Sequence, residues 1–223
     1  DILSCRLGAD RLALTGPVRL GYLWSQRDGP APVRRGINGS HERSSGGVRV
    51  LVTTTAMPDE SWFILREVFA VSAAFADIVF LIKSHPLCSV DRRLALLAQR
   101  YRDVRYQVCS QRATELLKNS CAVITGATSV GIEAIRLGCM PIVYDGGWRY
   151  DSYPMRDIED AVFFFRDAQE LREALTQTLA DQDAARRRRE RWPAALEALC
   201  HAPGEDPVGA LYDALRSRGL LAP

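Results

Sequence analysis

From Val48 onward, short apolar runs alternate with longer stretches that have the periodicity of amphipathic helices. Strands that alternate with helices predict a parallel sheet with right-handed crossovers. The sequence therefore predicts an α/β fold, a doubly wound, Rossmann-like parallel sheet with helices on both faces. Asp59 is the expected N-cap of the first helix, and Gly138 is expected at the C′ position after the helix 129–137. The strands are expected at 48–53, 78–82, 104–108, 122–125, 141–144 and 161–165, and the helices at 59–75, 91–101, 113–119, 129–137, 168–179, 183–199 and 207–218.

The composition is that of a globular protein with a sizeable core. Of the 223 residues, 47% are hydrophobic and 25% charged, so no disulfide framework is needed for stability. The formal net charge of +2 argues against nucleic acid as a partner. The six cysteines show no C-x-x-C spacing, which argues against a zinc site and indicates a reduced, cytoplasmic compartment. No run approaches the ~20 apolar residues of a membrane span.

A linker is predicted before the alternating pattern begins. Residues 28–47 are dominated by Gly, Pro, Ser and charged residues, and they show no apolar periodicity. This composition is typical of a flexible connection between two folded parts.

The segment after the strand 122–125 has the residues of an anion site. Ligands of doubly wound sheets bind at the carboxyl ends of the strands. Gly126 and Ala127 are small and leave room for a ligand to approach the backbone. Thr128 and Ser129 place hydroxyls beside the free amides of the next helix, where the helix dipole favours a phosphate. The alternative is that these hydroxyls only cap the helix.

Two residues of that helix extend the prediction. Gly131 in the first turn costs about 1 kcal/mol relative to alanine, which indicates that something must come close. Glu133 lies four residues after Ser129, on the same helix face, where a carboxylate could accept hydrogen bonds from a ribose diol. The alternative is that Glu133 only complements the helix dipole.

A second candidate segment follows the strand 78–82. Lys83 and His85 are expected at the carboxyl edge of the sheet, and Pro86 keeps His85 extended. A histidine there can donate a hydrogen bond to a phosphoryl oxygen or protonate it as a leaving group. An ordinary surface histidine is the alternative.

The segments K-S-H-P (83–86) and T-G-A-T-S-V-G-I-E-A-I-R-L-G-C-M-P-I-V-Y (125–144) together resemble the donor-binding, C-terminal half of GT-B glycosyltransferases. The likeness is greatest to bacterial surface-polysaccharide enzymes: sialyltransferases, polysialyltransferases, Kdo transferases and glycerophosphotransferases. The resemblance implies that His85, with Lys83 nearby, contacts the donor phosphate and that Thr128 and Ser129 hold it from the other side. The stretch from Glu133 to Ile142 also resembles transferases that use UDP- or GDP-sugars, where the glutamate binds ribose, and UDP-GlcNAc 2-epimerases.

The resemblance implies transfer of a sugar from a nucleotide sugar, CMP-linked rather than UDP-linked, to a surface-carbohydrate or lipid-linked acceptor without a metal or other cofactor. Thr125 stands where retaining enzymes of the E-x7-E kind carry their first acid, which favours an inverting mechanism. Residues 1–27 are then the tail of a missing N-terminal acceptor domain, and 48–223 the nucleotide-sugar-binding domain. The enzyme would be cytoplasmic or lie at the inner face of the membrane. The alternatives are a UDP-GlcNAc 2-epimerase-like enzyme and a non-catalytic module that binds a nucleotide or phospho-ligand.

Four further segments have weaker signals. Thr53–Thr55 could line the donor cleft or simply belong to a Thr-rich strand, and the loop 145–153 could close over a sugar or be an ordinary surface loop. Asp181-Gln-Asp183 has the letters of a metal-binding D-x-D motif, but it lies in a helical, Arg-rich stretch, so no metal is expected. Arg186–Arg189 with Arg191 is expected to be a solvated helix face, with contact to anionic lipid headgroups as the alternative.

Overall fold

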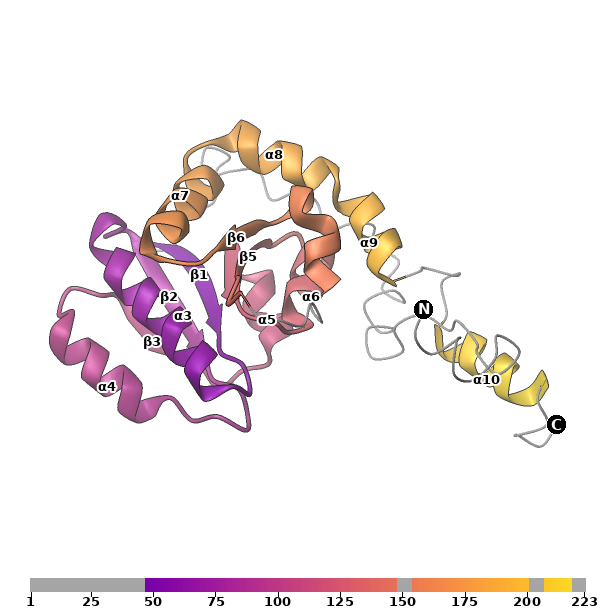
Figure 1. Ribbon diagram of the computed structural model, residues 1–223, viewed down its shortest axis with the longest axis horizontal. Helices are drawn as coiled ribbons and strands as arrows, with labels where there is room; N and C mark the ends of the chain where they lie inside the picture. The colour runs from indigo at the N-terminus through magenta and orange to yellow at the C-terminus, as the bar shows by residue number, and fades with distance from the viewer. Residues whose placement is uncertain (1–46, 148–153, 201–206, 218–223) are drawn as a thin grey trace. The chain divides into compact units, whose positions relative to one another are not determined.

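Six parallel strands form the centre of the structure, in the spatial order β3-β2-β1-β4-β5-β6. The computed structural model describes residues 47–147, 154–200 and 207–217 (Figure 1). This all-parallel, Rossmann-like sheet confirms the predicted fold class. The strands are β1 (Val48–Thr53), β2 (Ile78–Lys83), β3 (Tyr106–Val108), β4 (Ala122–Thr125), β5 (Met140–Tyr144) and β6 (Phe163–Phe165).

The strand order reverses at the centre of the sheet. The chain runs outward from β1 to β3, returns to place β4 on the other side of β1, and continues outward to β6. The ladder between β1 and β4 pairs Val50 with Ala122 and Val52 with Ile124. The loops after β1 and β4 therefore leave the sheet next to each other at a topological switch point, where doubly wound sheets bind their ligands.

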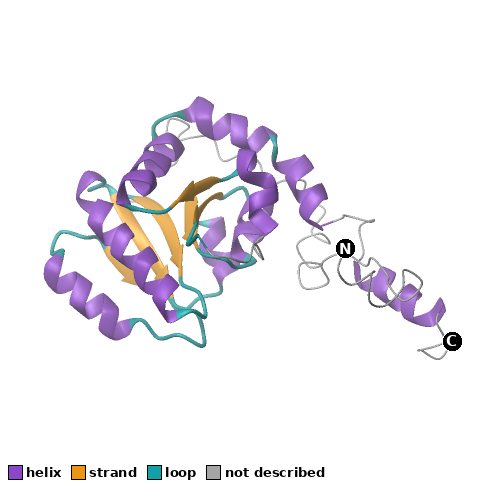
Figure 2. Ribbon diagram, viewed as in Figure 1, coloured by secondary structure: helices purple, strands orange, loops and turns teal. Residues whose placement is uncertain are grey.

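Helices cover both faces of the sheet (Figure 2). α3, α4 and α7 pack together on one face, and α5 and α6 pack together on the other. The middle of each central strand, Val50–Val52 in β1 and Ala122–Ile124 in β4, is apolar because both faces of the sheet are buried there. The helices are α3 (Pro58–Val71), α4 (Asp91–Arg100), α5 (Ala113–Lys118), α6 (Val130–Arg136), α7 (Ala168–Leu179), α8 (Gln182–Glu190), α9 (Trp192–Cys200) and α10 (Pro207–Ser217), with 3-10 helices η3 (Ser72–Ala74) and η4 (Pro154–Ala161).

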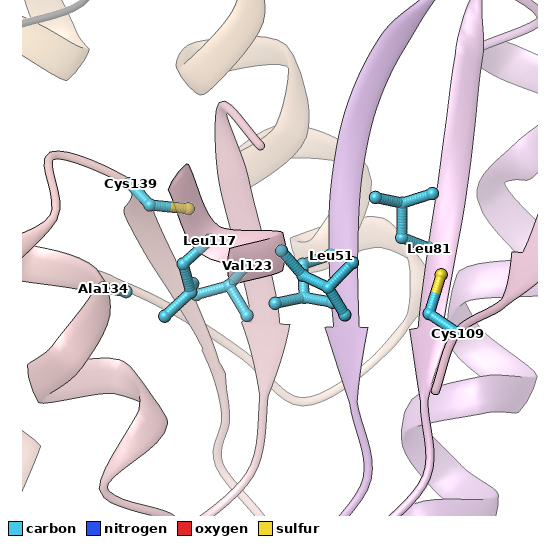
Figure 3. Close-up of a cluster of buried hydrophobic side chains, with 8 residues drawn as sticks. Leu51, Leu81, Cys109, Leu117, Val123, Ala134 and Cys139 are labelled. Atoms are coloured by element: carbon cyan, nitrogen blue, oxygen red, sulfur yellow. The ribbon is translucent and has the colours of Figure 1, made fainter. Parts of the chain in front are cut away.

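One buried cluster fills the space between the sheet and the α5–α6 layer. Leu51 and Val123 lie on neighbouring central strands, and their side chains point to the same side (Figure 3). Cys109 and Cys139 take part as small apolar side chains, since both are buried. The cluster consists of Leu51, Leu81, Cys109, Leu116, Leu117, Val123, Ala134 and Cys139.

The first helix begins earlier than the sequence predicts. Its N-cap is Met57 and not Asp59, which lies in the first turn of α3. Pro58 is the first helical residue, a position that suits proline because the amide hydrogen it lacks would have no partner there.

The predicted helix 183–199 is two helices. α8 ends at Glu190 and α9 begins at Trp192, with Pro193 in its first turn. Proline cannot continue a helix from the preceding turn without losing a hydrogen bond. β3 begins at Tyr106, two residues later than predicted. Gly138, after α6, has a φ of 78°, which confirms its predicted role as a C′ glycine.

The chain divides into two units. Of the described residues, those up to residue 195 belong to one unit, and the end of α9 with α10 belongs to the other. The predicted tail 1–27, the predicted linker up to residue 46 and residues 148–153 of the predicted surface loop lie outside the described residues. None of the helices in the described ranges has both the length and the apolar character needed to cross a membrane.

Candidate functional site

The strand order brings the two predicted site segments to the same edge of the sheet. β1 lies between β2, which leads to Lys83 and His85, and β4, which leads to Thr128 and Ser129. Because all of these strands are parallel, their carboxyl ends meet at one edge. The threonines at the end of β1 stand between the two segments.

Buried hydroxyls tie the end of β1 to the loop after β4. Thr53 Oγ1 donates to Thr125 Oγ1 at 2.8 Å, and Thr125 Oγ1 lies 3.0 Å from Thr128 Oγ1. Thr128 Oγ1 also accepts a hydrogen bond from the Val130 amide at 3.3 Å. These hydrogen bonds fix the start of α6 relative to β1, and the Thr128 hydroxyl satisfies the amide of Val130, the first residue of α6.

Thr54 ties β1 to the loop after β2 in the same way. Its Oγ1 accepts a hydrogen bond from the His85 amide at 2.9 Å, and its own amide donates to the Lys83 carbonyl at 3.1 Å. Thr53, Thr54 and Thr55 are each only 3% exposed. They therefore connect the loops of the site and do not line an open cleft.

The His85 ring is held in one tautomer. Nδ1 accepts a hydrogen bond from the Leu87 amide at 3.2 Å, so the ring hydrogen is on Nε2. The Cys88 amide also donates to the His85 carbonyl at 3.0 Å. Both bonds stabilise a turn in which Pro86 is the second residue. Nε2 has no hydrogen-bond partner among the described residues, and the side chain is half-buried. This ring can donate a hydrogen bond to an acceptor outside the protein.

Lys83 points to the other side of β2. Its Nζ donates to the Ser110 carbonyl at 3.2 Å, in the loop after the neighbouring strand β3. The structure therefore does not bring the Lys83 ammonium to the loop after β4. Burial raises the pKa of the nearby Cys109 thiol, although Lys83 opposes the shift, so this thiol is a poor nucleophile.

The glycine at position 126 is required by packing within the protein. A Cβ there would lie 2.5 Å from Glu60 Oε1 and 2.7 Å from Thr55 Cγ2. Gly126 therefore leaves room for a buried carboxylate, where the sequence suggested room for a ligand. The same carboxylate oxygen accepts a hydrogen bond from the Ala127 amide at 3.2 Å.

The start of α6 confirms the predicted face shared by Ser129 and Glu133. Ser129 Oγ donates to Glu133 Oε1 at 3.4 Å, and Glu133 is buried. Ser129 is the N-cap residue, but its side chain makes no capping bond. In the part of the chain that the structure describes, the amides of Ser129 and Gly131 have no hydrogen-bond partner. These two donors and the dipole of a short helix favour an anion in front of them.

Sequence reasoning missed Glu60 and Ser61. Glu60 is 2% exposed, and Ser61 Oγ both accepts from the Thr55 amide and donates to the Thr55 carbonyl, each at 3.1 Å. An acid in the first turn of a helix is ordinary because it complements the dipole, so nothing in the sequence marks Glu60 as buried. The serine two residues after Asp59 could have suggested a tie to the preceding turn.

The acidic pair near residue 181 has a structural role. Asp181 is the N-cap of α8 and accepts a hydrogen bond from the Ala184 amide at 2.9 Å, and Asp183 pairs with Arg186 at 3.1 Å. Within the described ranges, no group of three or more His, Cys, Asp or Glu side chains is placed to hold a metal ion. At the other end of the site edge, Asp145 pairs with Arg156 and accepts from the Gly147 amide.

The sequence predicted that the arginines of α8 form a solvated helix face, but two of them are partly buried. Arg188 stacks over the Phe163 ring at 3.8 Å from its centroid and donates to the Val162 carbonyl at 3.0 Å. Arg189 is half-buried, and this burial lowers its pKa. Only part of this basic face is therefore available to water.

No family model matches the sequence, and no curated protein matches it. Solved structures do match the fold. The catalytic domain of cholesterol-α-glucosyltransferase from Helicobacter pylori is 21% identical with a TM-score of 0.51, and the match covers 67% of this chain and 99% of that one. The C-terminal CMP-Kdo binding domain of WaaA from Acinetobacter baumannii is 15% identical with a TM-score of 0.51, covering 68% and 90%.

A second group of matching structures consists of epimerases. A putative UDP-N-acetylglucosamine 2-epimerase from Listeria monocytogenes is 13% identical with a TM-score of 0.64, and the match covers 100% of this chain and 57% of that one. At such low identities the likeness shows the fold alone. The chain therefore has a Rossmann-like, glycosyltransferase-like fold, to which the structures of the epimerases are also similar.

Proposed function

We propose that this chain is the donor-binding part of an inverting GT-B glycosyltransferase that acts on a nucleotide sugar. The observation that carries the proposal is the hydrogen-bonded network at the switch point. It fixes His85 on one side and the loop Gly126–Ser129 on the other, with Thr53 and Thr54 between them. A phosphate bound at this edge would be recognised from both sides.

In this proposal the donor phosphate accepts hydrogen bonds from His85 Nε2 and from the amides of Ser129 and Gly131, with the Thr128 hydroxyl beside it. Glu133 accepts hydrogen bonds from the ribose. The acceptor hydroxyl attacks the anomeric carbon from the face opposite the phosphate, and the bond to the phosphate oxygen breaks. Donors fixed in advance stabilise the negative charge that develops on this leaving group.

The base that takes the proton from the acceptor hydroxyl belongs, in this proposal, to a separate acceptor domain. That domain would present a surface carbohydrate or a lipid-linked acceptor. Lys83 adds positive charge at the same edge without contacting the phosphate, since its ammonium is held by the Ser110 carbonyl.

A calorimetric panel of CMP, CDP, UDP and GDP with the 223-residue chain tests the proposal. We expect a cytidine nucleotide to bind most tightly, as the His-Pro resemblance suggests, and binding of none of the four would contradict the proposal. The fold match to WaaA supports the choice, because the matched part of WaaA is a CMP-Kdo binding domain.

Two variants test the site assignment. His85→Ala removes a hydrogen bond to a charged group worth about 2 kcal/mol, which is roughly thirtyfold in Kd. Ser129→Ala keeps the amide that binds the phosphate but removes the hydroxyl that orients Glu133 toward the ribose. It should therefore weaken binding by less, roughly fivefold, for a loss of about 1 kcal/mol. Leu87→Ala, in the same turn but 82% exposed, and Ser120→Ala, at the amino end of β4, are matched controls. If His85→Ala and Ser129→Ala bind like the parent, the assignment is wrong.

The second candidate function is that of a UDP-GlcNAc 2-epimerase-like enzyme. The observation that favours it is the epimerase match over the whole chain, with a TM-score of 0.64. Incubation with UDP-GlcNAc in the absence of an acceptor distinguishes the two. Formation of the 2-epimer supports the epimerase, whereas tight nucleotide binding without epimerisation supports the transferase.

A further inference from the structure

A carboxylate from α3 contacts the loop Gly126–Ser129, which is the candidate phosphate-binding loop. Glu60 lies in the first turn of α3 and is 2% exposed. Its Oε1 accepts the Ala127 amide at 3.2 Å, across 67 residues of sequence. The carboxylate therefore joins the loop after β4 to the helix after β1, on opposite sides of the switch point.

The Glu60 carboxylate packs directly against the backbone of the loop at Gly126. The position that a Cβ of residue 126 would take lies 2.5 Å from Glu60 Oε1 and 2.6 Å from Glu60 Cδ. Gly126 is therefore what allows the carboxylate to lie against the loop backbone. No other residue type could occupy position 126 while Glu60 keeps its place.

Glu60 is itself held in a rigid frame. Ser61 makes two hydrogen bonds of 3.1 Å to the Thr55 backbone, one to the amide and one to the carbonyl. Thr55 Oγ1 also accepts a hydrogen bond from the Met57 amide at 3.2 Å. The turn from β1 into α3 therefore fixes where the carboxylate can reach.

Burying a carboxylate is costly unless it is strongly hydrogen-bonded, and an apolar side chain of the same length would fill this space at less cost. We propose that Glu60 is a positioning residue, whose carboxylate holds the loop Gly126–Ser129 in the conformation that receives the donor phosphate. This inference rests on the proposed function for its ligand. It assigns Glu60 no contact with that ligand, since Glu60 acts through the Ala127 amide.

Two variants of equal length separate the hydrogen bond from the shape. Glu60→Gln keeps an oxygen that can accept from the Ala127 amide, and Glu60→Met fills the same space without one. Glu67→Gln is the matched control, because Glu67 is also a buried glutamate of α3 but pairs with Arg66. Each variant of the full chain is measured for Ala127 amide exchange by NMR, for nucleotide Kd by calorimetry and for stability to urea.

The expected pattern separates positioning from simple stability. Glu60→Met should lose at least about tenfold in Ala127 protection and about tenfold in nucleotide affinity, because a small displacement of a binding group is costly. Its stability should equal or exceed that of Glu60→Gln, since a buried polar group has been removed. Glu60→Gln should bind the nucleotide with a Kd within about threefold of the parent's. Glu67→Gln should have the parent's Ala127 protection and nucleotide Kd.

Nucleotide binding by Glu60→Met that equals the parent would overturn the inference while leaving the proposed function intact. If affinity follows stability across all variants, Glu60 is structural and the inference is also wrong. If the parent binds none of the four nucleotides, the proposed function fails. The amide-exchange data then still decide whether Glu60 positions the loop. Unchanged Ala127 protection in Glu60→Met then overturns the positioning role, whereas lost protection supports it.

Discussion

Replacing Gly126 with alanine tests the packing under the candidate site. The new Cβ would lie 2.5 Å from Glu60 Oε1 and 2.7 Å from Thr55 Cγ2, both in buried side chains. Overpacking of this kind costs about 2 kcal/mol. The carboxylate must also move off the Ala127 amide, and losing this charge-assisted hydrogen bond costs a further ~2 kcal/mol. The expected loss of ~4 kcal/mol corresponds to a decrease in Tm of about 12 °C for a chain of this length.

Urea unfolding followed by circular dichroism measures this loss. Gly147→Ala is the control, because Gly147 has a φ of 63° and nothing within 4 Å of its Cβ position, so only backbone strain of about 1 kcal/mol is expected. In a Glu60→Ala background the Gly126 substitution should cost about 3 kcal/mol less than in the parent, since both the hydrogen bond to the Ala127 amide and most of the clash are already gone. Equal costs for Gly126→Ala and Gly147→Ala, or the same cost in both backgrounds, would refute the reasoning.

Three further predictions concern other parts of the described structure. The pKa of the Cys121 thiol is raised to about 11 by burial, so its alkylation at pH 8, followed by mass spectrometry, should be roughly 100-fold slower than after unfolding. The pKa of this thiol is higher in the folded state than in the unfolded state, so its contribution to the free energy of unfolding is present below pH 9 and is lost as the pH rises through about 11. Urea unfolding at pH 8 and pH 10 should show this decrease. Thr125→Val should cost about 1–3 kcal/mol by leaving the buried Thr53 hydroxyl without its acceptor, and Thr53→Val combined with it should recover part of the loss in the same assay. Asp167→Ala should cost about 1 kcal/mol in thermal unfolding by removing the N-cap bond to the Glu170 amide, and Asp167→Asn should recover most of it.

The fold was predictable because its central strands are buried on both faces over most of their length. Continuous apolar runs such as Val50–Val52 and Ala122–Ile124 are a strong signal, and helices between them leave few alternatives to a parallel sheet. Element boundaries were less certain because a single residue decides them. Pro58 and Pro193 moved the start of one helix and divided another.

The candidate site was predictable only in part, because topology places its residues whereas contacts distant in sequence hold them. Residues that follow a strand and precede a helix, such as Thr128 and Ser129, reach the correct edge by topology alone. The ties that hold them come from 67 to 72 residues away, as in the contacts of Glu60 with Ala127 and of Thr53 with Thr125. Such distant partners leave no periodic or local mark in the sequence.

The placement of β4 beside β1 also has a consequence for how the chain is made. A ribosome releases β1, β2 and β3 first, and these can pair with one another while the other edge of β1 is still open. Until residues 122–125 emerge, Val50, Leu51 and Val52 form an apolar edge with unpaired backbone groups. Such an edge is prone to aggregation, so we expect a nascent chain that stalls before β4 to need protection by a chaperone.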